Sequence, residues 1–505
     1  MESIQQYGIF EITMPKGSHS GVPEGVFSCG NKSVHARGFA ENAEVGTVRF
    51  MPEVQGDWRY SITWGGETLE GDFCCTEPKD GVHGPVRAHG QHFSYADGTR
   101  YIPVGTTCYA WIHQPTELIR QTLETLASAP FNKIRMCVFP KSMPYNQNDP
   151  ALYPFAKKAD GAWDIQRPDP LFWAHLEQCI RALAELGIEA DLILFHPYDR
   201  WGFSTLAQED NLNYVHYAIR RLSAFRNVWW ALSNEYEFSF KKTITDWDQF
   251  GEMLAAEDPY HHLISAHDWI TPYPKRGWLT HVSLQCADTR EAFRIREEYG
   301  LPTIDDELGY EGDIPFQWGN LSAFEFMNRA WALAAFGCYI SHGETFHRED
   351  EVLWWAKGGK LYGEAPARLK FFREVMESLP GPMEPACAEA VRYPNGNASS
   401  EGHRQLIKRI WEMESDKGRR HIQMEMTQPI GQHPDFRLIY LERQARSFIA
   451  LDLPEEGRYK VEILDIWNMT RRQAVSGVRG KFTIGLPGGE GIAVLVTRLS
   501  GDALC

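Results

Sequence analysis

The chain has 505 residues, a formal net charge of −16, and 43% hydrophobic and 23% charged residues. This length predicts several domains, and the composition is that of an ordinary globular protein. The acidic balance argues against nucleic acid and anionic membrane surfaces as partners, because both attract basic patches.

Targeting signals and cysteine frameworks are both missing from the sequence. The first residues, MESIQQYGIFEITMPKG, lack a basic segment followed by an apolar core, so no signal peptide is predicted. No apolar run approaches the roughly 18 residues that cross a bilayer. The ten cysteines form no CxxC pair, and Cys108 and Cys137 lie in apolar runs where cysteine acts as a small buried hydrophobe. Together these features predict a cytoplasmic protein.

Residues 1–82 alternate in short apolar and polar runs separated by turn residues. The segment from Val48 to Trp64 places two strands around a turn, and a further strand follows near Gly71 to Thr76. This spacing predicts an N-terminal β-sandwich. A segment rich in glycine and histidine, residues 81–98, is interpreted as a connection with a small hairpin.

Residues 83–384 alternate between buried strands and amphipathic helices. The predicted strands are Tyr101–Trp111, Asn132–Pro140, Glu189–Asp199, Asn227–Glu237, His262–His267, His281–Cys286, Pro302–Tyr310 and Cys338–Phe346. Eight such units over roughly 280 residues predict a (β/α)8 barrel. A doubly wound open sheet is the alternative, and it is disfavoured because no glycine-rich phosphate loop follows the first strand.

Residues 385–505 return to short strands punctuated by turns. Seven runs are predicted to be strands: 405–414, 419–427, 436–442, 446–454, 459–468, 480–487 and 491–499. They predict a C-terminal β-sandwich, so the fold class is a multidomain α/β protein with a central barrel between two β-domains. The two β-domains also offer surfaces for a homo-oligomer.

The most informative stretch is NVWWALSNEYE, from Asn227 to Glu237. Its apolar run is too continuous for a half-exposed strand and is typical of a parallel strand buried on both faces. Catalytic groups of such barrels lie at the C-terminal ends of the strands, and this strand ends in Asn234 and Glu235. Burial at an apolar rim favours a protonated carboxyl, which suits a general acid. A capping pair is the structural alternative.

Retaining cleavage of a glycosidic bond requires two carboxyl groups about 5 Å apart. Glu307, at the end of the seventh strand, supplies a second acid at the same barrel face. The chain thus resembles the clan of retaining (β/α)8 glycosidases that includes cellulases, mannanases and β-galactosidases. It is most similar to apiosidase-like and provisionally assigned cellulase barrels, on the phrases VRFMPEVQGDW, DGTRYIPVGTT and PTIDDELGYEG.

The resemblance covers essentially the whole chain and implies roles for particular residues. Glu235, preceded by Asn234, matches the acid/base of the clan, and Glu307 matches its nucleophile. Asn234 is then expected to bind a sugar hydroxyl. Arg135 on the second strand would favour the ionised form of Glu307. The alternative for Arg135 is a cation that satisfies a buried backbone or carboxylate group.

Further residues at strand ends are candidates for substrate binding. His196 would support Glu235 or bind a hydroxyl, and Tyr310 would orient the nucleophile. Because side chains alternate along a strand, Asp306 is expected to point away from the face that Glu307 occupies. The other candidates are Glu344, which also competes for the nucleophile role, Trp111, Tyr109, Trp201 and His267; each aromatic ring could instead be core or rim packing.

Two other functions compete with the glycosidase. A metal-dependent hydrolase is suggested by His196, His267, His342 and His347 near strand ends, but no His-Glu-x-x-His helix occurs. A non-catalytic carbohydrate-binding protein would be expected to lack one of the two acids. The sequence therefore favours a retaining glycoside hydrolase without metal or organic cofactor, exo-acting on β-linked oligosaccharides or small glycosides.

Overall fold

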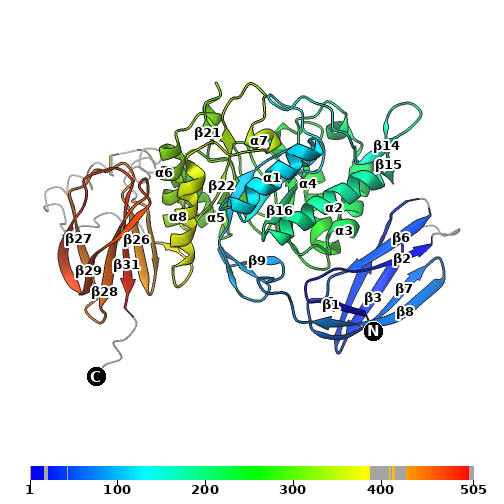
Figure 1. Cartoon of the computed structure of the whole chain (residues 1–505), viewed down its shortest axis with the longest axis horizontal. Coiled ribbons are helices and arrows are strands. Elements are labelled where there is room, and N and C mark those ends of the chain that lie inside the picture. Colours follow the sequence, from blue (N-terminus) through cyan, green and yellow to red (C-terminus); the bar gives the residue numbers. More distant parts are fainter. Residues whose placement is uncertain are drawn as a thin grey trace. The chain divides into compact units, whose positions relative to one another are not determined.

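The computed structural model describes residues 2–15, 21–42, 44–386, 409, 412–413, 415 and 428–499. Figure 1 draws the whole chain. The chain divides into two compact units. The first comprises Met1–Gln285, Tyr299–Asp306 and Ser341–Tyr362, and the second comprises Cys286–Glu298, Glu307–Ile340 and Gly363–Cys505. The domain boundaries expected after residues 82 and 384 stay predictions, because the units divide the chain differently.

Two sheets form the N-terminal β-domain of the first unit. One has the order β1-β8-β7-β3-β4, and the other has the order β2-β6-β5. Aromatic rings of both sheets share one core, in which Phe27 stacks on Phe50 and Phe10 stacks on Phe73. The strands are β1 (Glu2–Gln5), β2 (Phe10–Pro15), β3 (Glu24–Cys29), β4 (Lys32–Arg37), β5 (Phe39–Ala40), β6 (Val45–Phe50), β7 (Gly56–Trp64) and β8 (Glu67–Thr76). This arrangement matches the predicted sandwich.

A small three-stranded sheet follows, made of β9 (Val86–His89), β10 (His92–Tyr95) and β11 (Arg100–Tyr101). The Phe93 ring of β10 lies 5.5 Å from the Trp229 ring and 5.7 Å from the His281 ring. Both partners lie where barrel strands begin, so this sheet covers the amino-terminal end of the barrel, opposite the strand ends that were predicted to carry the site.

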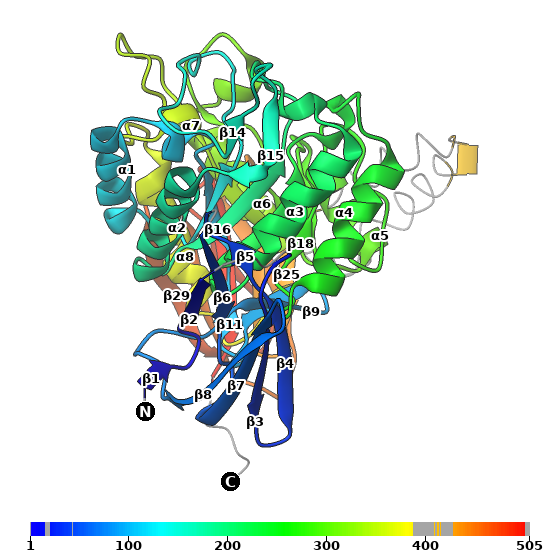
Figure 2. The same ribbon diagram turned by 90° about the vertical axis from the view of Figure 1, so that its right-hand side faces the viewer.

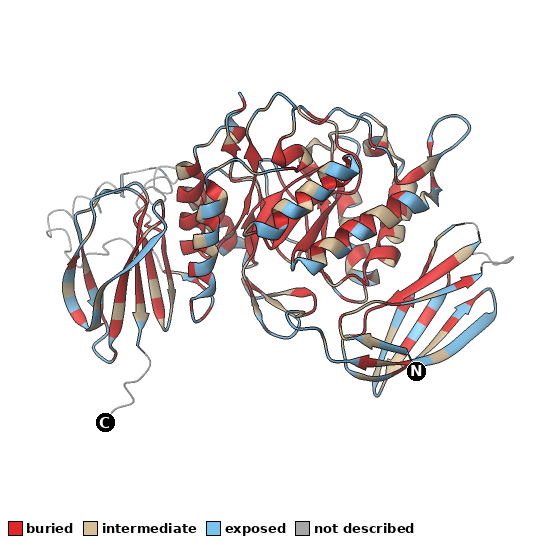
Figure 3. Cartoon of the chain, in the orientation of Figure 1, coloured by how far each residue is buried: buried red, intermediate tan, exposed pale blue. Residues whose placement is uncertain are grey.

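Eight parallel strands form the barrel, in the order β18-β17-β16-β13-β12-β22-β20-β19. A bridge between His267 and Ser283 joins the two outer strands, so the sheet nearly closes. Figure 3 shows these strands as almost entirely buried, as expected for parallel strands covered on both faces. They are β12 (Val104–Thr107), β13 (Lys133–Cys137), β16 (Glu189–Phe195), β17 (Val228–Ser233), β18 (Ile264–Ser265), β19 (Val282–Leu284), β20 (Thr303–Asp305) and β22 (Tyr339–His342). The predicted (β/α)8 fold is confirmed.

The helices between the strands bury one apolar face each. The helices are α1 (Thr116–Ser128), α2 (Pro170–Glu185), α3 (Gln208–Leu222), α4 (Ile244–Glu257), α5 (Thr289–Tyr299), α6 (Ala323–Ala335), α7 (Trp354–Lys357) and α8 (Ala365–Glu377). Helices α3 and α4 lie side by side (Figure 2). The Asp169 side chain caps α2 by accepting the N–H groups of Leu171 and Phe172. Within the described part of the chain, no helix is long and apolar enough to cross a membrane.

Short elements stand between the helices and strands. They are the turns of 3-10 helix η1 (Trp111–His113), η2 (Phe203–Thr205), η3 (Tyr236–Phe238) and η4 (Gln317–Gly319), and the short strands β14 (Phe155–Lys157), β15 (Trp163–Pro168), β21 (Glu311–Gly312) and β23 (Glu344–Thr345). Most of them follow a barrel strand and precede its helix. They therefore supply backbone to the loops at the C-terminal face of the barrel.

A buried ionic cluster fills the barrel interior. Lys133 lies 2.8 Å from Asp191 and 2.7 Å from Asp306, and the hydroxyls of Ser283 and Ser341 each donate to Asp306 at 2.6 Å. Burial alone would raise the pKa of Asp306, but Lys133 and Arg135 outweigh it and hold that pKa well below its usual range. The Asp306 carboxylate thus points into the barrel interior, and the Asp306 N–H donates to the Leu284 carbonyl at 2.9 Å, which continues the pairing of β20 with β19. That Glu307 occupies the opposite face from Asp306 stays a prediction.

The C-terminal β-domain belongs to the second unit. One sheet has the order β24-β25-β26-β31-β28-β29, and β27 pairs with β30. The Tyr440 hydroxyl donates to Asn328 of α6 at 2.8 Å, so this domain rests on a barrel helix of its own unit. The strands are β24 (Glu384–Pro385), β25 (Ile430–His433), β26 (Phe436–Tyr440), β27 (Phe448–Leu453), β28 (Tyr459–Asp465), β29 (Thr470–Val478), β30 (Gly480–Gly485) and β31 (Ile492–Arg498). The predicted runs 405–414 and 419–427 lie largely or wholly outside the described residues.

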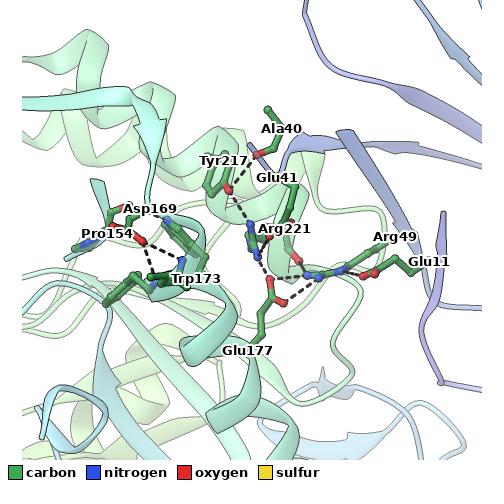
Figure 4. A network of polar contacts seen from close by, with 12 residues as sticks. Glu11, Ala40, Glu41, Arg49, Pro154, Asp169, Trp173, Glu177, Tyr217 and Arg221 are labelled. Atoms are coloured by element: carbon green, nitrogen blue, oxygen red, sulfur yellow. Dashed lines mark hydrogen bonds and ion pairs between the residues drawn. The ribbon is translucent and has the colours of Figure 1, made fainter. Parts of the chain in front are cut away.

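A second buried ionic network joins the N-terminal β-domain to helices α2 and α3 (Figure 4). Arg49 of β6 makes a bidentate contact with Glu177 of α2, at 2.6 and 2.8 Å, and bonds to Glu11 at 2.5 Å. Arg221 of α3 binds the same Glu177 and also Glu41. One buried carboxylate thus balances two buried guanidinium groups, which is a costly arrangement to break.

We therefore expect Glu177→Ala to leave Arg49 and Arg221 without their shared anion. The free energy of unfolding should fall by about 3–5 kcal/mol, measured by denaturant titration. Arg120→Ala, which removes an exposed helix-surface pair with Glu117 and Glu124, is the matched control and should leave the unfolding midpoint unchanged. If the two variants lowered the free energy of unfolding equally, the buried network would contribute no more to stability than the exposed pair.

Five histidines of the described barrel residues are enclosed and neutral. Burial lowers the pKa of His113 to about 4, lowers that of His196, His281 and His342 to about 3, and lowers that of His267 well below its usual value. In the unfolded chain these imidazoles bind protons near pH 6.5. The unfolded state therefore takes up more protons than the folded state below that pH.

Stability should consequently fall as the pH drops from 6.5 towards 4. Each neutral histidine contributes a slope of up to about 1.4 kcal/mol per pH unit in this window. Melting temperatures measured across pH 4–8 should be level above pH 7 and decline steeply below pH 6. A level curve down to pH 4.5 would contradict the neutral, enclosed state of these side chains.

Candidate active site

The Asn234–Glu235 pair lies directly after β17, as predicted. The Asn234 N–H donates to the Phe195 carbonyl at 3.0 Å, which continues the parallel pairing by one residue. Glu235 then turns into the left-handed region, with φ 47° and ψ 63°. A non-glycine residue pays about 1–3 kcal/mol for that backbone conformation and keeps it only where surrounding contacts impose it.

His267, after β18, supplies those contacts. Its Nδ1 accepts the Glu235 N–H at 3.3 Å, its carbonyl accepts the Tyr236 N–H at 3.0 Å, and its own N–H donates to Ser233 at 3.1 Å. The very low pKa of His267, caused by burial and by nearby Arg135, keeps Nδ1 unprotonated and able to accept. His267 is fully buried and holds the Glu235 turn, and its role in binding substrate stays a prediction.

The Glu235 carboxylate is oriented by a tyrosine. The Tyr198 hydroxyl donates to Glu235 Oε2, and Tyr198 follows β16 by three residues. The buried Lys141 ammonium lies 4.5 Å from the centre of the Tyr198 ring and 3.2 Å from that of the Tyr109 ring. A cation on the faces of two rings is attracted by both ring quadrupoles. Lys141 thus ties together the two tyrosines that reach Glu235 and its neighbour.

Asn234 is held from the opposite side. Its Oδ1 accepts from the Tyr109 hydroxyl at 2.9 Å and from Arg135 Nη2 at 3.0 Å. Both donors fix the amide orientation, which presents the Asn234 amino group as a hydrogen-bond donor. Arg135 also lies 3.9 Å from Asp306, so the guanidinium connects the interior ionic cluster to Asn234.

His196 is the other polar group at the end of β16. Its Nε2 lies 3.2 Å from the Phe139 carbonyl, which assigns the ring proton to Nε2. Burial and the nearby Lys141 lower the pKa of His196 to about 3, so the ring is neutral. Among the described residues, Nδ1 of His196 has no hydrogen-bond partner. It is therefore an enclosed acceptor inside the fold, and its predicted role in binding a hydroxyl stays a prediction.

Glu307 and Tyr310 belong to the second unit. Glu307 follows β20 by two residues and is half-buried, whereas Tyr310 is buried and its N–H donates to the Trp318 carbonyl at 2.7 Å. The nearby Glu311 accepts the N–H groups of Glu364 and Ala365, at 2.7 and 3.0 Å, at the start of α8. A carboxylate at the N-terminal end of a helix is stabilised by the helix dipole. The burial of Glu311 is therefore explained by its structural role at the start of α8.

The remaining predicted residues differ in how they fit a binding role. Trp111 is fully buried in η1, which favours the alternative of core packing over a sugar-binding role. Trp201 is half-exposed, and its indole N–H donates to Asp149 at 2.8 Å. Glu344 is buried, and its Oε1 accepts the Tyr362 N–H at 2.6 Å. Tyr109 acts through Asn234.

Two residues of this site were missed by the sequence analysis. Lys141 directly follows the second predicted strand and Tyr198 lies at the end of the third, so both had the positional signal of a strand end. They lacked a chemical signal, because a lysine and a tyrosine in polar loops are ordinary surface residues. Lys141 is distinguished only by its burial, and Tyr198 only by its hydrogen bond to Glu235.

The site therefore holds one oriented carboxyl, an amide and a neutral imidazole at the C-terminal end of the barrel strands, beside the Tyr109 and Tyr198 rings. Such an arrangement can bind hydroxyl groups and transfer a proton. It is typical of sites that act on polyhydroxylated ligands, where a few fixed donors and acceptors read individual hydroxyls.

Comparison with known proteins assigns the barrel. Residues 87–360, more than half of the chain, match the family described as "Apiosidase-like, catalytic domain". Residues 426–497 match a family described as a domain of unknown function (DUF5605). No curated protein matches the chain.

Solved structures agree with this assignment. A Bacteroides vulgatus protein with a provisional glycoside hydrolase description has 32% sequence identity and a TM-score of 0.85, over 99% of this chain and 100% of its own. A family 5 glycoside hydrolase from the same organism has 14% identity and a TM-score of 0.61, over 83% of this chain and 95% of its own, which is a likeness of fold. The chain belongs to the apiosidase-like family and is a glycoside hydrolase.

Proposed function

We propose that this glycoside hydrolase retains the configuration of the sugar that it cleaves. Glu235 protonates the glycosidic oxygen while Glu307 attacks the anomeric carbon, which breaks the bond to the leaving group and forms a glycosyl–enzyme ester. Glu235 then removes a proton from water, and that water releases the sugar from Glu307. Each carboxyl group ends the cycle in its starting protonation state.

The observation that carries the proposal is the conformation of Glu235. Its backbone is held in an unfavourable region by His267, and its carboxylate is oriented by Tyr198. A fold keeps such strain where a side chain must be placed for function. The position of Glu307 just after β20, the seventh strand, supports its assignment as the partner acid.

The neighbouring polar groups suit sugar hydroxyls. The amino group of Asn234 donates to a hydroxyl beside the scissile carbon, and His196 Nδ1 accepts from another. Arg135 acts through Asn234 as a positioning residue. Among the other predicted binding residues, Tyr109 also acts through Asn234, and Trp201 lies on the loop that borders the site.

We further propose exo action on β-linked oligosaccharides or small glycosides. The long segment after β13 carries the hairpin β14–β15 and is tied to the loop after β16. Arg200 donates to Asp149 and to the Gln147 carbonyl, both at 2.8 Å, and Trp163 donates to the Trp201 carbonyl at 2.8 Å. Two loops joined in this way favour a closed end of the cleft over an open groove for polymers.

Variants of the two acids provide the test, with a panel of aryl β-glycosides as substrates. Glu307→Ala should lose turnover, and azide should restore formation of a glycosyl azide of inverted configuration. Glu235→Ala should lose roughly 100- to 10,000-fold in rate, least on good leaving groups, and azide should yield the retained product. Product configurations are read by NMR.

Controls separate this mechanism from its rivals. Glu185→Ala, an exposed acid at the end of α2, should keep the wild-type rate. EDTA should leave the activity unchanged; loss of activity with restoration by a divalent metal would favour the metal-dependent alternative. Wild-type rates in both acid variants would refute the two-carboxylate assignment and bring forward Glu344.

The Tyr198 hydrogen bond has its own consequence. Tyr198→Phe removes a donor from the Glu235 carboxylate, so the protonated acid persists to higher pH. The basic limb of kcat/KM against pH should move up by about one pH unit. Tyr236→Phe is the matched control, because that hydroxyl donates to the Thr271 carbonyl and should leave the limb in place. Identical shifts in both variants would contradict the role of Tyr198.

A further inference from the structure

Large apolar side chains are exposed on the two loops beside Glu235. Phe240, after β17, is 87% exposed, and Trp269 and Ile270, after β18, are 43% and 66% exposed. The half-buried Phe238 connects them: its ring lies 4.6 Å from the Trp269 ring and 6.3 Å from the Phe240 ring. We call Phe238, Phe240 and Trp269 the rim platform.

Hydrogen bonds from one carboxylate hold the two loops together. The Glu237 carboxylate accepts three successive N–H groups, from Trp269 at 2.7 Å, Ile270 at 3.0 Å and Thr271 at 2.8 Å. Charge-assisted bonds of this kind are stronger than neutral ones. The backbone of the loop after β18 is therefore tied to the loop after β17, which keeps Trp269 beside Phe238.

Exposure of these rings has no explanation in the packing of the fold. Contiguous exposed aromatic surface marks binding sites, because burial against a ligand recovers the hydrophobic free energy. Aromatic faces carry a negative quadrupole and attract the polarised C–H groups on the face of a sugar ring. A saccharide therefore matches the platform chemically.

The platform begins one turn after the proposed acid. The Phe238 N–H donates to the Glu235 carbonyl at 3.0 Å, within η3. A general acid must lie next to the glycosidic oxygen, which joins the cleaved sugar to its leaving group. Residues that extend outward from the acid thus border the leaving group, whereas the nucleophile borders the anomeric carbon of the cleaved sugar.

From these contacts we propose that the rim platform is the subsite for the leaving group, and that the leaving group is a saccharide ring whose C–H face stacks on Trp269 and Phe240. This inference rests on the proposed role of Glu235. Glu237 is a positioning residue that holds the platform and does not itself contact the ligand.

Two substrates with the same cleaved sugar test the platform. One is the glycosyl fluoride, which has no ring in its leaving group, and the other is the β-linked disaccharide, each built on the sugar that the aryl glycoside panel identifies. For Trp269→Ala and Phe240→Ala, kcat/KM for the disaccharide should fall about tenfold, while that for the fluoride stays within twofold. Phe448→Ala, which removes a ring 55% exposed on β27 of the C-terminal β-domain, is the matched control and should change neither.

Glu237→Gln tests the hydrogen bonds between the two loops, with the same fluoride and disaccharide as substrates. It keeps the size of the side chain but weakens the three bonds, so the disaccharide should be affected more than the fluoride, and the platform variants and Glu237→Gln should not add when combined. Circular dichroism and melting temperature verify that each variant is folded.

Each other outcome has a distinct meaning. Equal losses on both substrates would overturn the subsite and show that the loops only support Glu235. Unchanged rates on both would also overturn it. The platform variants could instead lose self-association in sedimentation, with the ratio of kcat/KM for disaccharide and fluoride unchanged. That result would identify a second copy of the chain as the occupant. If the wild type cleaves neither substrate nor any panel glycoside, the proposed function itself is refuted. If the wild type is active but the platform variants leave the ratio of kcat/KM for the two substrates unaltered, only the platform is refuted.

Discussion

The barrel depends on one buried charge cluster around Asp306. Lys133, Ser283 and Ser341 all contact this carboxylate, so β13, β19 and β22 converge on the residue that follows β20. Transfer of these charges out of water is expensive, and only their mutual contacts offset that cost. Because removal of one partner leaves an uncompensated charge, the cluster permits essentially one mutual register of the strands.

The ionic cluster also positions the candidate site, because alternate side chains of a strand point to the same side. Lys133 and Arg135 are two residues apart on β13, so both point into the barrel, with Arg135 nearer the C-terminal end. Arg135 lies beside Asp306 on one side and donates to Asn234 on the other. The position of the Asn234 amide is therefore set by the same ionic cluster that fixes the strands.

Neutral histidines and aromatic rings complete the environment of Glu235. A charged imidazole at His267 could not accept the Glu235 N–H, so the low dielectric of the interior is what makes the turn at Glu235 feasible. Lys141 remains close by, between two tyrosine rings. The site thus combines a strained backbone, a fixed cation and neutral acceptors, which together favour a single orientation of the carboxyl group.

Much of this protein could be predicted from local sequence. Unbroken apolar runs such as Val228–Leu232 indicated buried parallel strands, and their alternation with helices indicated the barrel, because periodicity and burial are local properties of the chain. The pair Asn234–Glu235 could be placed at a strand end for the same reason. The inward direction of Asp306, the burial of Trp111, and the role of His267 as a support for the Glu235 turn were decided only by the tertiary structure. Each depends on contacts between segments far apart in sequence, which the local periodicity of the chain does not specify.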